Sequence, residues 1–166
     1  FMWRNAVHGK DEALRLIYSF VETLPIATPS DFLRSQIEAG VGALLAASDD
    51  RRARRRQVLD WLQVEFEVDS PGQKLSTVET LDESSFIAEV RARRSRTAPR
   101  LTPAALKDLK STYAAHVLPL RTLVDRMATT ERQVAAWVNA AYGLTAEDVA
   151  LMWKTAPPRM PAGVGQ

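Results

Sequence analysis

The feature that most constrains this 166-residue chain is a long series of apolar residues at three- and four-residue spacing in its second half. The series runs from Leu106 to Met127 and follows Thr102-Pro103, a pair that suits a helix cap and the first helical position. Such spacing places apolar side chains on one face of an α-helix of about six turns. We expect Pro119, inside the series, to kink or break this helix.

The first half of the chain also shows helical spacing and no convincing strand alternation. A first helix is expected over residues 11–24. A second is expected from Asp31, capped by Thr28 or Ser30. It either gives way to a new helix near Ser48-Asp49-Asp50 or continues unbroken to Phe66. Two glycines in it, Gly40 and Gly42, indicate close packing against another backbone.

The segment 68–82 is the least helical, and we expect a connecting loop that Leu75, Val78 and Leu81 anchor to the core. A helix should follow over 82–94. Asp82 would cap it, and its apolar residues, Phe86, Ile87 and Val90, would point inward.

The last part of the chain carries further helix boundaries. Thr129 or Thr130 is expected to cap a short helix, and Gly143 is placed where a helix end needs a left-handed residue. Thr145 and Asp148 have the spacing of a capping box for a last helix that ends near Lys154. The fold class predicted from these boundaries is all-α: about six helices with long antiparallel pairs and little or no sheet. Residues 1–166 would form a single helical domain, with 155–166 as an extended tail.

Composition excludes several kinds of chemistry. The chain has no cysteine, which rules out disulfides and thiolate ligands and fits a cytoplasmic protein. No apolar run approaches the roughly 20 residues that span a bilayer, so no membrane partner is expected. His8 and His116 are far apart, so we expect surface or packing roles and no metal site. No nucleophile, base or glycine-rich phosphate loop is recognisable, and Pro157-Pro158 lacks the flanking residues of an amino-methyltransferase motif. We therefore expect no catalytic residue and no cofactor in this chain.

Arginine is distributed very unevenly. Two short segments hold 10 of the 22 basic residues, and the other 12 face 20 acidic ones, so the rest of the chain is acidic. Such asymmetry favours a polyanionic partner, because arginine forks suit phosphate oxygens. The candidate DNA-binding residues are Arg51, Arg52, Arg54, Arg55 and Arg56 in the first cluster and Arg91, Arg93, Arg94, Arg96 and Arg100 in the second.

Each cluster has an alternative interpretation. The first would be a solvated helix face balanced by acids such as Asp49, Asp50 and Asp60, although five arginines in six residues must cover more than one face. The second would be a flexible basic linker. A DNA-reading helix-turn-helix around Gly143 is disfavoured, because acids begin its second helix and would repel phosphates. Several apolar residues are instead expected in the core: Leu144, Val149, Leu151, Met152, Trp61, Trp137 and Trp153.

Several short segments between residues 24 and 161 form an ordered series. They are Leu24-Pro25-Ile26-Ala27-Thr28-Pro29, Val58–Phe66, Pro71–Leu75, Leu81-Asp82, Phe86–Val90 and Tyr142-Gly143-Leu144-Thr145. The series resembles the C-terminal regions of bacterial adenine-specific DNA methyltransferases of restriction-modification systems, including single-chain enzymes that combine restriction and modification.

The resemblance implies a fragment of a larger enzyme. The parent would use S-adenosylmethionine to methylate adenine N6 in double-stranded DNA and would flip the base out. Its catalytic and cofactor motifs lie upstream of such a region, so no catalytic residue transfers to this chain. The leading hypothesis is a helical accessory domain that assists DNA binding. The alternative is a structural module that braces the upstream methyltransferase and target-recognition domains or dimerises, for example through the Leu106–Met127 stripe.

Overall fold

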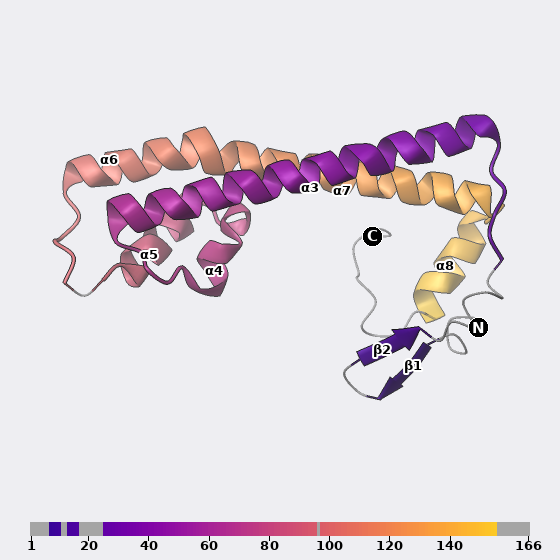
Figure 1. Cartoon of the computed structure of the whole chain (residues 1–166), viewed down its shortest axis with the longest axis horizontal. Helices are drawn as coiled ribbons and strands as arrows, with labels where there is room; N and C mark the ends of the chain where they lie inside the picture. The colour runs from indigo at the N-terminus through magenta and orange to yellow at the C-terminus, as the bar shows by residue number, and fades with distance from the viewer. Residues whose placement is uncertain (1–6, 11–12, 17–24, 96, 156–166) are drawn as a thin grey trace.

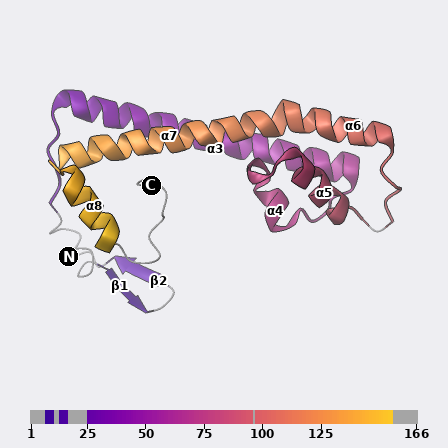
Figure 2. The same ribbon diagram turned by 180° about the vertical axis from the view of Figure 1, so that it is seen from behind.

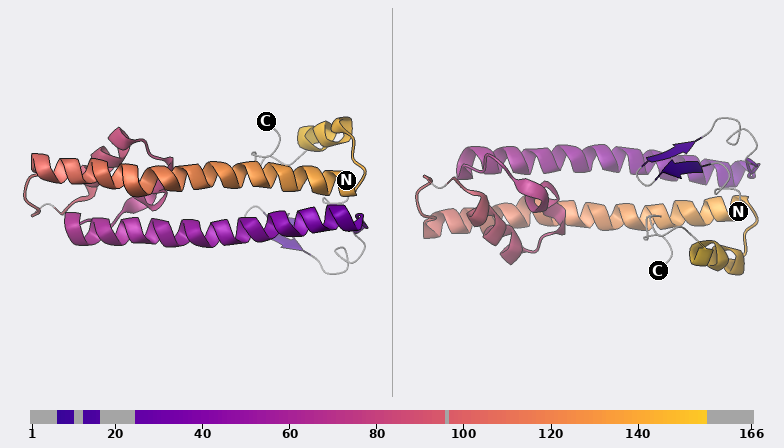
Figure 3. Two further views of the ribbon diagram at one scale, coloured as in Figure 1. Left: turned by 90° about the horizontal axis from the view of Figure 1, so that it is seen from above. Right: turned by 90° about the horizontal axis from the view of Figure 1, so that it is seen from below.

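Two long antiparallel helical rods dominate the molecule in the computed structural model, which describes residues 7–10, 13–16, 25–95 and 97–155. The first rod is the single helix α3 (Asp31–Phe66). The second is built from α6 (Pro103–Thr112), the π-helix η2 (Tyr113–Val117) and α7 (Leu118–Ala141). The rods lie side by side along their length (Figure 1; Figure 3). The predicted all-α class with a long antiparallel pair is confirmed.

The N-terminal segment differs from the sequence-based expectation. A small antiparallel hairpin joins β1 (Val7–Lys10) to β2 (Ala13–Leu16), with Val7 opposite Leu16. The helix predicted over residues 11–24 is therefore wrong at Ala13–Leu16, where strand pairing takes the place of helical bonds, and its other residues lie outside the described ranges. The hairpin is too small to change the fold class.

Helix α3 is continuous, which decides between the two alternatives for its middle. Ser30 is the N-cap, and its side-chain oxygen accepts a hydrogen bond from the Leu33 amide at 3.3 Å. The acids at 49 and 50 do not interrupt the helix, because they pair with arginines one turn later on the same helix. The helix ends at Glu67, whose backbone is left-handed with φ of 53°.

Pro119 does not break the second rod. A proline has no amide hydrogen and its ring clashes with the carbonyl four residues earlier. The chain widens into the π-turn η2 just before it, where the Leu118 amide bonds to the Tyr113 carbonyl. The helix predicted to start at Thr129 or Thr130 is also wrong, because both residues lie inside α7 and their hydroxyls donate to carbonyls four residues earlier.

The segment between the rods is more ordered than a loop. It forms α4 (Gly72–Ser76), the 3-10 helix η1 (Val78–Thr80) and α5 (Glu83–Arg93), and it covers one end of the rods (Figure 2). Leu75 and Val78 are fully buried and Leu81 packs against the core, as predicted. Asp82 caps α5 through the Ser85 amide, which also confirms the prediction.

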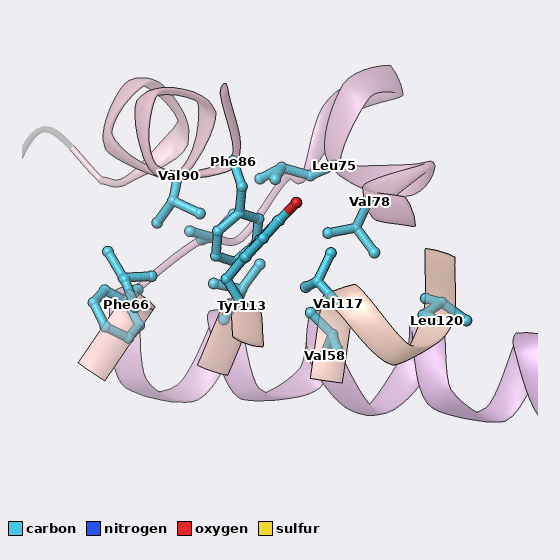
Figure 4. Close-up of a cluster of buried hydrophobic side chains, with 12 residues drawn as sticks. Val58, Phe66, Leu75, Val78, Phe86, Val90, Tyr113, Val117 and Leu120 are labelled. Carbon is cyan, nitrogen blue, oxygen red and sulfur yellow. The ribbon is translucent and has the colours of Figure 1, made fainter. Parts of the chain in front are cut away.

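The hydrophobic core lies wholly at this end of the molecule. Side chains from both rods converge on those of α4, η1 and α5, and the Phe86 and Tyr113 rings meet with centroids 5.7 Å apart (Figure 4). We call this end the head: residues 51–95 together with residues 97–120. The rest of the hairpin is the arm: α3 from Asp31 to Asp50 and α7 from Arg121 to Ala141. The buried core residues are Val58, Leu62, Phe66, Val68, Leu75, Val78, Phe86, Val90, Leu109, Tyr113, Val117 and Leu120.

The two rods of the arm approach each other closely at Gly40. Gly40 is buried, and a Cβ atom at this position would lie 2.5 Å from Val134 Cγ2 and 3.1 Å from Trp137 Cζ3. Gly42 has nothing within 4 Å of such an atom. The expectation of close packing is therefore confirmed for Gly40, against side chains of α7, and is wrong for Gly42.

The last helix, α8 (Ala146–Thr155), is built as predicted but packs differently. Gly143 has φ of 66°, and Thr145 and Asp148 form the capping box, with the Thr145 amide 2.9 Å from Asp148 Oδ2. No residue of α8 is buried. Leu151, Met152 and Trp153 are exposed, so their predicted place in the core is wrong. Of the expected tail, Thr155 is helical, and residues 156–166 lie outside the described ranges.

Candidate nucleic-acid interface

The first arginine cluster divides between opposite faces of α3. Arg51 and Arg55 are one turn apart and both turn inward onto Glu79 of η1. Arg51 donates from Nε at 3.0 Å and from Nη2 at 2.7 Å to Glu79 Oε1, and Arg55 Nε donates to Oε2 at 3.2 Å. Arg55 Nη2 also contacts Oε1. The prediction that the five arginines cover more than one face of the helix is confirmed.

Glu79 is the buried charge that these two arginines neutralise, and it is only 4% exposed. Burial alone would raise the pKa of its carboxyl group. The hydrogen bonds from Arg55 and Arg51, with the charge of Arg55, outweigh burial, so the net pKa lies below its ordinary value. Glu79 is therefore ionised, and Arg51 and Arg55 fasten α3 to the connecting segment.

The other three arginines of the first cluster face outward. Arg54 pairs with Asp50 at 2.7 Å, and Arg52 approaches Asp49 at 3.8 Å. The Asp50 carboxylate raises the pKa of Arg54 through a hydrogen bond and its charge. Arg56 is exposed and forms no ion pair with any described residue. The balancing role predicted for Asp49 and Asp50 is confirmed, whereas Asp60 forms no such pair within the described ranges.

The second cluster is also divided. Arg93 pairs with Glu89 at 3.1 Å, and Lys74 reaches the same carboxylate at 3.5 Å. Arg94 ties the loop to α3, donating from Nε to the Phe66 carbonyl at 3.1 Å and from Nη1 to the Pro99 carbonyl at 2.8 Å.

Two arginines of the second cluster remain available. Arg91 and Arg100 are exposed and have no ion pair with the residues that the structure describes. Arg96 lies outside the described ranges. Arg93 and Arg94 of the second cluster are therefore held by other residues of the protein, whereas Arg91 and Arg100 are exposed without an ion pair in the described ranges. The alternative of a wholly flexible linker does not describe this arrangement.

Two surface grooves each contain two arginines, one groove for each cluster. The first, of about 680 Å³, lies between α3 and η2 and contains Arg54, Arg56 and His116. The second, of about 510 Å³, lies between the end of α3 and the start of α6 and contains Arg94 and Arg100. The fold therefore places both clusters on the head but does not merge them into one site.

The described residues offer no constellation for catalysis or metal binding. No group of three or more His, Asp or Glu side chains in these ranges could hold a metal ion. On α6, Leu109 is buried while its neighbours Asp108 and Lys110 are exposed, as expected for a solvated helix face. Within the same ranges, no helix combines the length and the apolar character needed to cross a membrane.

Two arrangements escaped the sequence reasoning. Glu79 could have been suspected from its place as the lone acid between buried Val78 and partly buried Leu81. The Leu81 carbonyl accepts a hydrogen bond from the Tyr113 hydroxyl at 3.1 Å, and Arg121 Nη1 donates to that hydroxyl at 2.8 Å. No local pattern predicts the partners of Glu79 or the contact of Leu81 with Tyr113, because these residues lie far apart in the chain.

Residues 30–138 match the family described as Domain of unknown function (DUF8810), and the chain belongs to that family. The matched region begins at the N-cap of α3 and ends near the close of α7, so it comprises the arm and the head. No curated protein and no solved structure matches the chain significantly.

Proposed function

We propose that this member of the DUF8810 family is the C-terminal helical accessory region of an adenine-specific DNA methyltransferase of the restriction-modification type. In this proposal it assists DNA binding through contacts to phosphates and carries no catalysis of its own. Its partners are double-stranded DNA and the upstream methyltransferase and target-recognition domains of the parent chain.

The order of segments that resemble such enzymes supports the link to methyltransferases. Three of these segments, Val58–Phe66, Leu81-Asp82 and Phe86–Val90, supply core or capping residues of the head. The resemblance therefore concerns the residues that build the fold. S-adenosylmethionine would be bound by the parent upstream, and no residue here carries a cofactor or base-flipping role.

The observation that carries the DNA-binding part is that three exposed arginines of the two clusters have no acidic partner in the described ranges: Arg56, Arg91 and Arg100. A guanidinium group without an ion pair can donate hydrogen bonds to phosphate oxygens, and no ion pair has to be broken first. Arg52, Arg54 and Arg93 are weaker candidates for contact with phosphates, because each already has an acidic partner. Their exposed ion pairs are worth only about 0–1 kcal/mol, so phosphates can replace the acids.

Three of the sequence-predicted arginines are better assigned to the fold. Arg51 and Arg55 hold the buried Glu79, and Arg94 holds the backbone of Phe66 and Pro99. With few phosphate contacts and no base-reading element, binding by the isolated chain should be weak, non-specific and sensitive to salt.

The test is binding of the purified chain to a short labelled DNA duplex over a series of salt concentrations. We expect the logarithm of the binding constant to fall linearly with the logarithm of salt concentration. Replacing Arg56, Arg91 and Arg100 together by glutamine should weaken binding and flatten that slope by about 3. A matched triple replacement of Lys107, Lys110 and Arg132, which are exposed cations outside both clusters, controls for net charge.

The outcomes separate the possibilities. Equal losses from the two triple variants would mean that total charge alone attracts DNA. Absence of binding by the wild-type chain at low salt would overturn direct DNA contact.

A bracing module is the second candidate, because a different observation favours it. Large apolar side chains stay exposed on the arm and on α8, among them Phe32, Leu45 and Trp153. Exposed apolar surface of this kind marks sites of protein contact. The stripe proposed for dimerisation is mostly unavailable, because Leu109, Tyr113, Val117 and Leu120 are buried in the head. This candidate predicts that Leu45→Ser weakens binding of the separately purified upstream domains while leaving DNA binding unchanged.

A further inference from the structure

The groove between α3 and η2 is lined by polar side chains from two different elements. The α3 wall offers Arg54, Arg56 and Gln57, and the η2 wall offers His116. All four side chains are exposed to solvent. Two small residues, Ala53 and Ala115, lie between them and leave room for a ligand.

The π-turn is what presents His116 to the groove. Tyr113 and Val117 are buried on either side of it in the sequence and fix the turn to the core. The residues between them, including His116, therefore remain on the surface, where Ala115 and His116 line the groove. Such π-turns are frequent at functional sites because they re-aim side chains without ending a helix.

The groove is lined by two arginines and two aspartates, Asp50 and Asp60, and one residue of each kind has no ion pair among the described residues. Arg54 is held by Asp50, whereas Arg56 has no ion pair among the described residues. The guanidinium of Arg56, the amide of Gln57 and the imidazole of His116 give nitrogen donors from two different elements. A phosphate group can accept from several directions at once, which matches donors that come from both walls.

We propose that this groove binds a phosphodiester of the DNA backbone, with Arg56 and His116 as its main donors and Gln57 as a further donor. The inference rests on the proposed DNA-binding function and specifies where on the head the strand is held. It also gives His116, which the sequence left as a surface or packing residue, a role in binding.

Removing the charge of Asp60 should change DNA binding in the opposite direction to removing that of Arg56. Asp60 lines the same groove, is exposed, and has no ion pair within the described ranges. A carboxylate at this place repels a phosphate, so removing its charge should tighten binding. If the phosphate lay elsewhere on the head, Asp60 would be screened and of little consequence.

The experiment uses the full chain and a short labelled duplex, with fluorescence anisotropy measured across a salt series. Arg56→Gln should weaken binding about threefold at moderate salt and lower the salt slope by about 1. His116→Gln should weaken binding, and Asp60→Asn should strengthen it. Arg126→Gln is the matched control, because it removes the same charge from an exposed arginine of α7 that has no ion pair in the described ranges and lies outside the groove and both clusters. It should change binding less than Arg56→Gln.

Circular dichroism first establishes that each variant is folded, and all four positions are exposed, which favours folding. The groove is the wrong site if the wild-type chain binds DNA while Arg56→Gln and Arg126→Gln have equal effects and Asp60→Asn has none. That result would leave the proposed function standing. Failure of the wild-type chain to bind DNA at all would overturn both.

Discussion

The head and the arm are built from the same two rods, yet they are stabilised in different ways. In the head, α3 buries Val58, Leu62 and Phe66 against a third layer made of α4, η1 and α5. In the arm, the same helix buries only Gly40 against α7. The difference shows that a long helix does not carry uniform stability, since most of its stability comes from packing of its apolar face.

This contrast also separates the two kinds of contact that the chain can make. The head has its own hydrophobic core, and its surface carries the exposed arginines of both clusters. The arm keeps large apolar side chains such as Leu45 exposed, and α8 adds Leu151 and Trp153. We therefore expect the head to be the self-sufficient DNA-binding part and the arm to be the part that a neighbouring protein surface completes.

The largest expected effect comes from two phenylalanines, one in each region. Phe86 is fully buried in the head, whereas Phe32 is 74% exposed at the start of the arm. Phe86→Ala should lower the free energy of unfolding by about 3–5 kcal/mol, because it leaves a cavity. Phe32→Ala should change it by about 0.5 kcal/mol or less. Urea denaturation followed by circular dichroism measures both, and similar losses would erase the distinction between head and arm.

The next effect concerns the ion pairs that close the head. Glu79→Gln removes the charge that Arg51 and Arg55 surround, and we expect a loss of about 1.5–3 kcal/mol. Because the pKa of Glu79 is lowered by folding, the unfolded carboxyl group takes up its proton first as the pH falls. Its stabilising contribution is therefore complete above the ordinary value of 4.5 and is lost as the pH falls through the lower folded value.

Thermal denaturation at pH 7 and at pH 3 checks this prediction. The difference in stability between the wild-type chain and Glu79→Gln should shrink at the lower pH. Glu65→Gln, which removes an exposed carboxylate of the same head that has no ion pair in the described ranges, serves as the control. An unchanged difference at both pH values would argue against the buried ion pairs.

Two glycines of α3, Gly40 and Gly42, test how closely the two rods pack in the arm. Gly40→Ala should destabilise the protein by about 1–3 kcal/mol, because its new methyl group meets Val134, a stiff β-branched side chain. Gly42→Ala should instead stabilise it by about 0.5–1 kcal/mol, since alanine favours the helix and nothing lies nearby. Differential scanning calorimetry distinguishes the two, and an equal gain from both would mean that the rods do not approach closely at Gly40.

The smallest expected effect lies beyond the arm, at α8. Thr145→Ala removes the hydroxyl that accepts the Asp148 amide hydrogen bond at 3.2 Å. Because α8 buries no residue, its fraying should leave the unfolding midpoint unchanged and only speed hydrogen exchange within residues 146–155. A clear drop in the midpoint would indicate that α8 is packed into the fold.

Local signals predicted the boundaries of most elements, because caps and turn residues act through neighbouring atoms. Asp82, Thr102-Pro103, Gly143 and the Thr145–Asp148 capping box all stand where the sequence placed them. The π-turn before Pro119 and the passage of α7 through Thr129 could not be predicted in this way. Both depend on packing of the second rod against α3, which overrides local preferences.

The candidate site was predicted less completely than the fold. The arginine clusters are visible in the sequence, but their partners are not. Glu79 lies 24 residues after Arg55, and only the folded connecting segment brings the two together. The sequence predicts that the five arginines at 51–56 cover more than one face of a helix, but only the structure shows that two of them surround a buried carboxylate and that two others line a groove with His116.

The most direct test of the contrast between head and arm is hydrogen–deuterium exchange of the backbone amides along α3 in the full chain. Our account predicts that amides at 56–66 exchange slowly, near the rate set by global unfolding, while those at 34–46 exchange much faster through local opening. Addition of the upstream domains should slow exchange in the second segment only. Equal protection along the whole helix in the isolated chain would contradict the account.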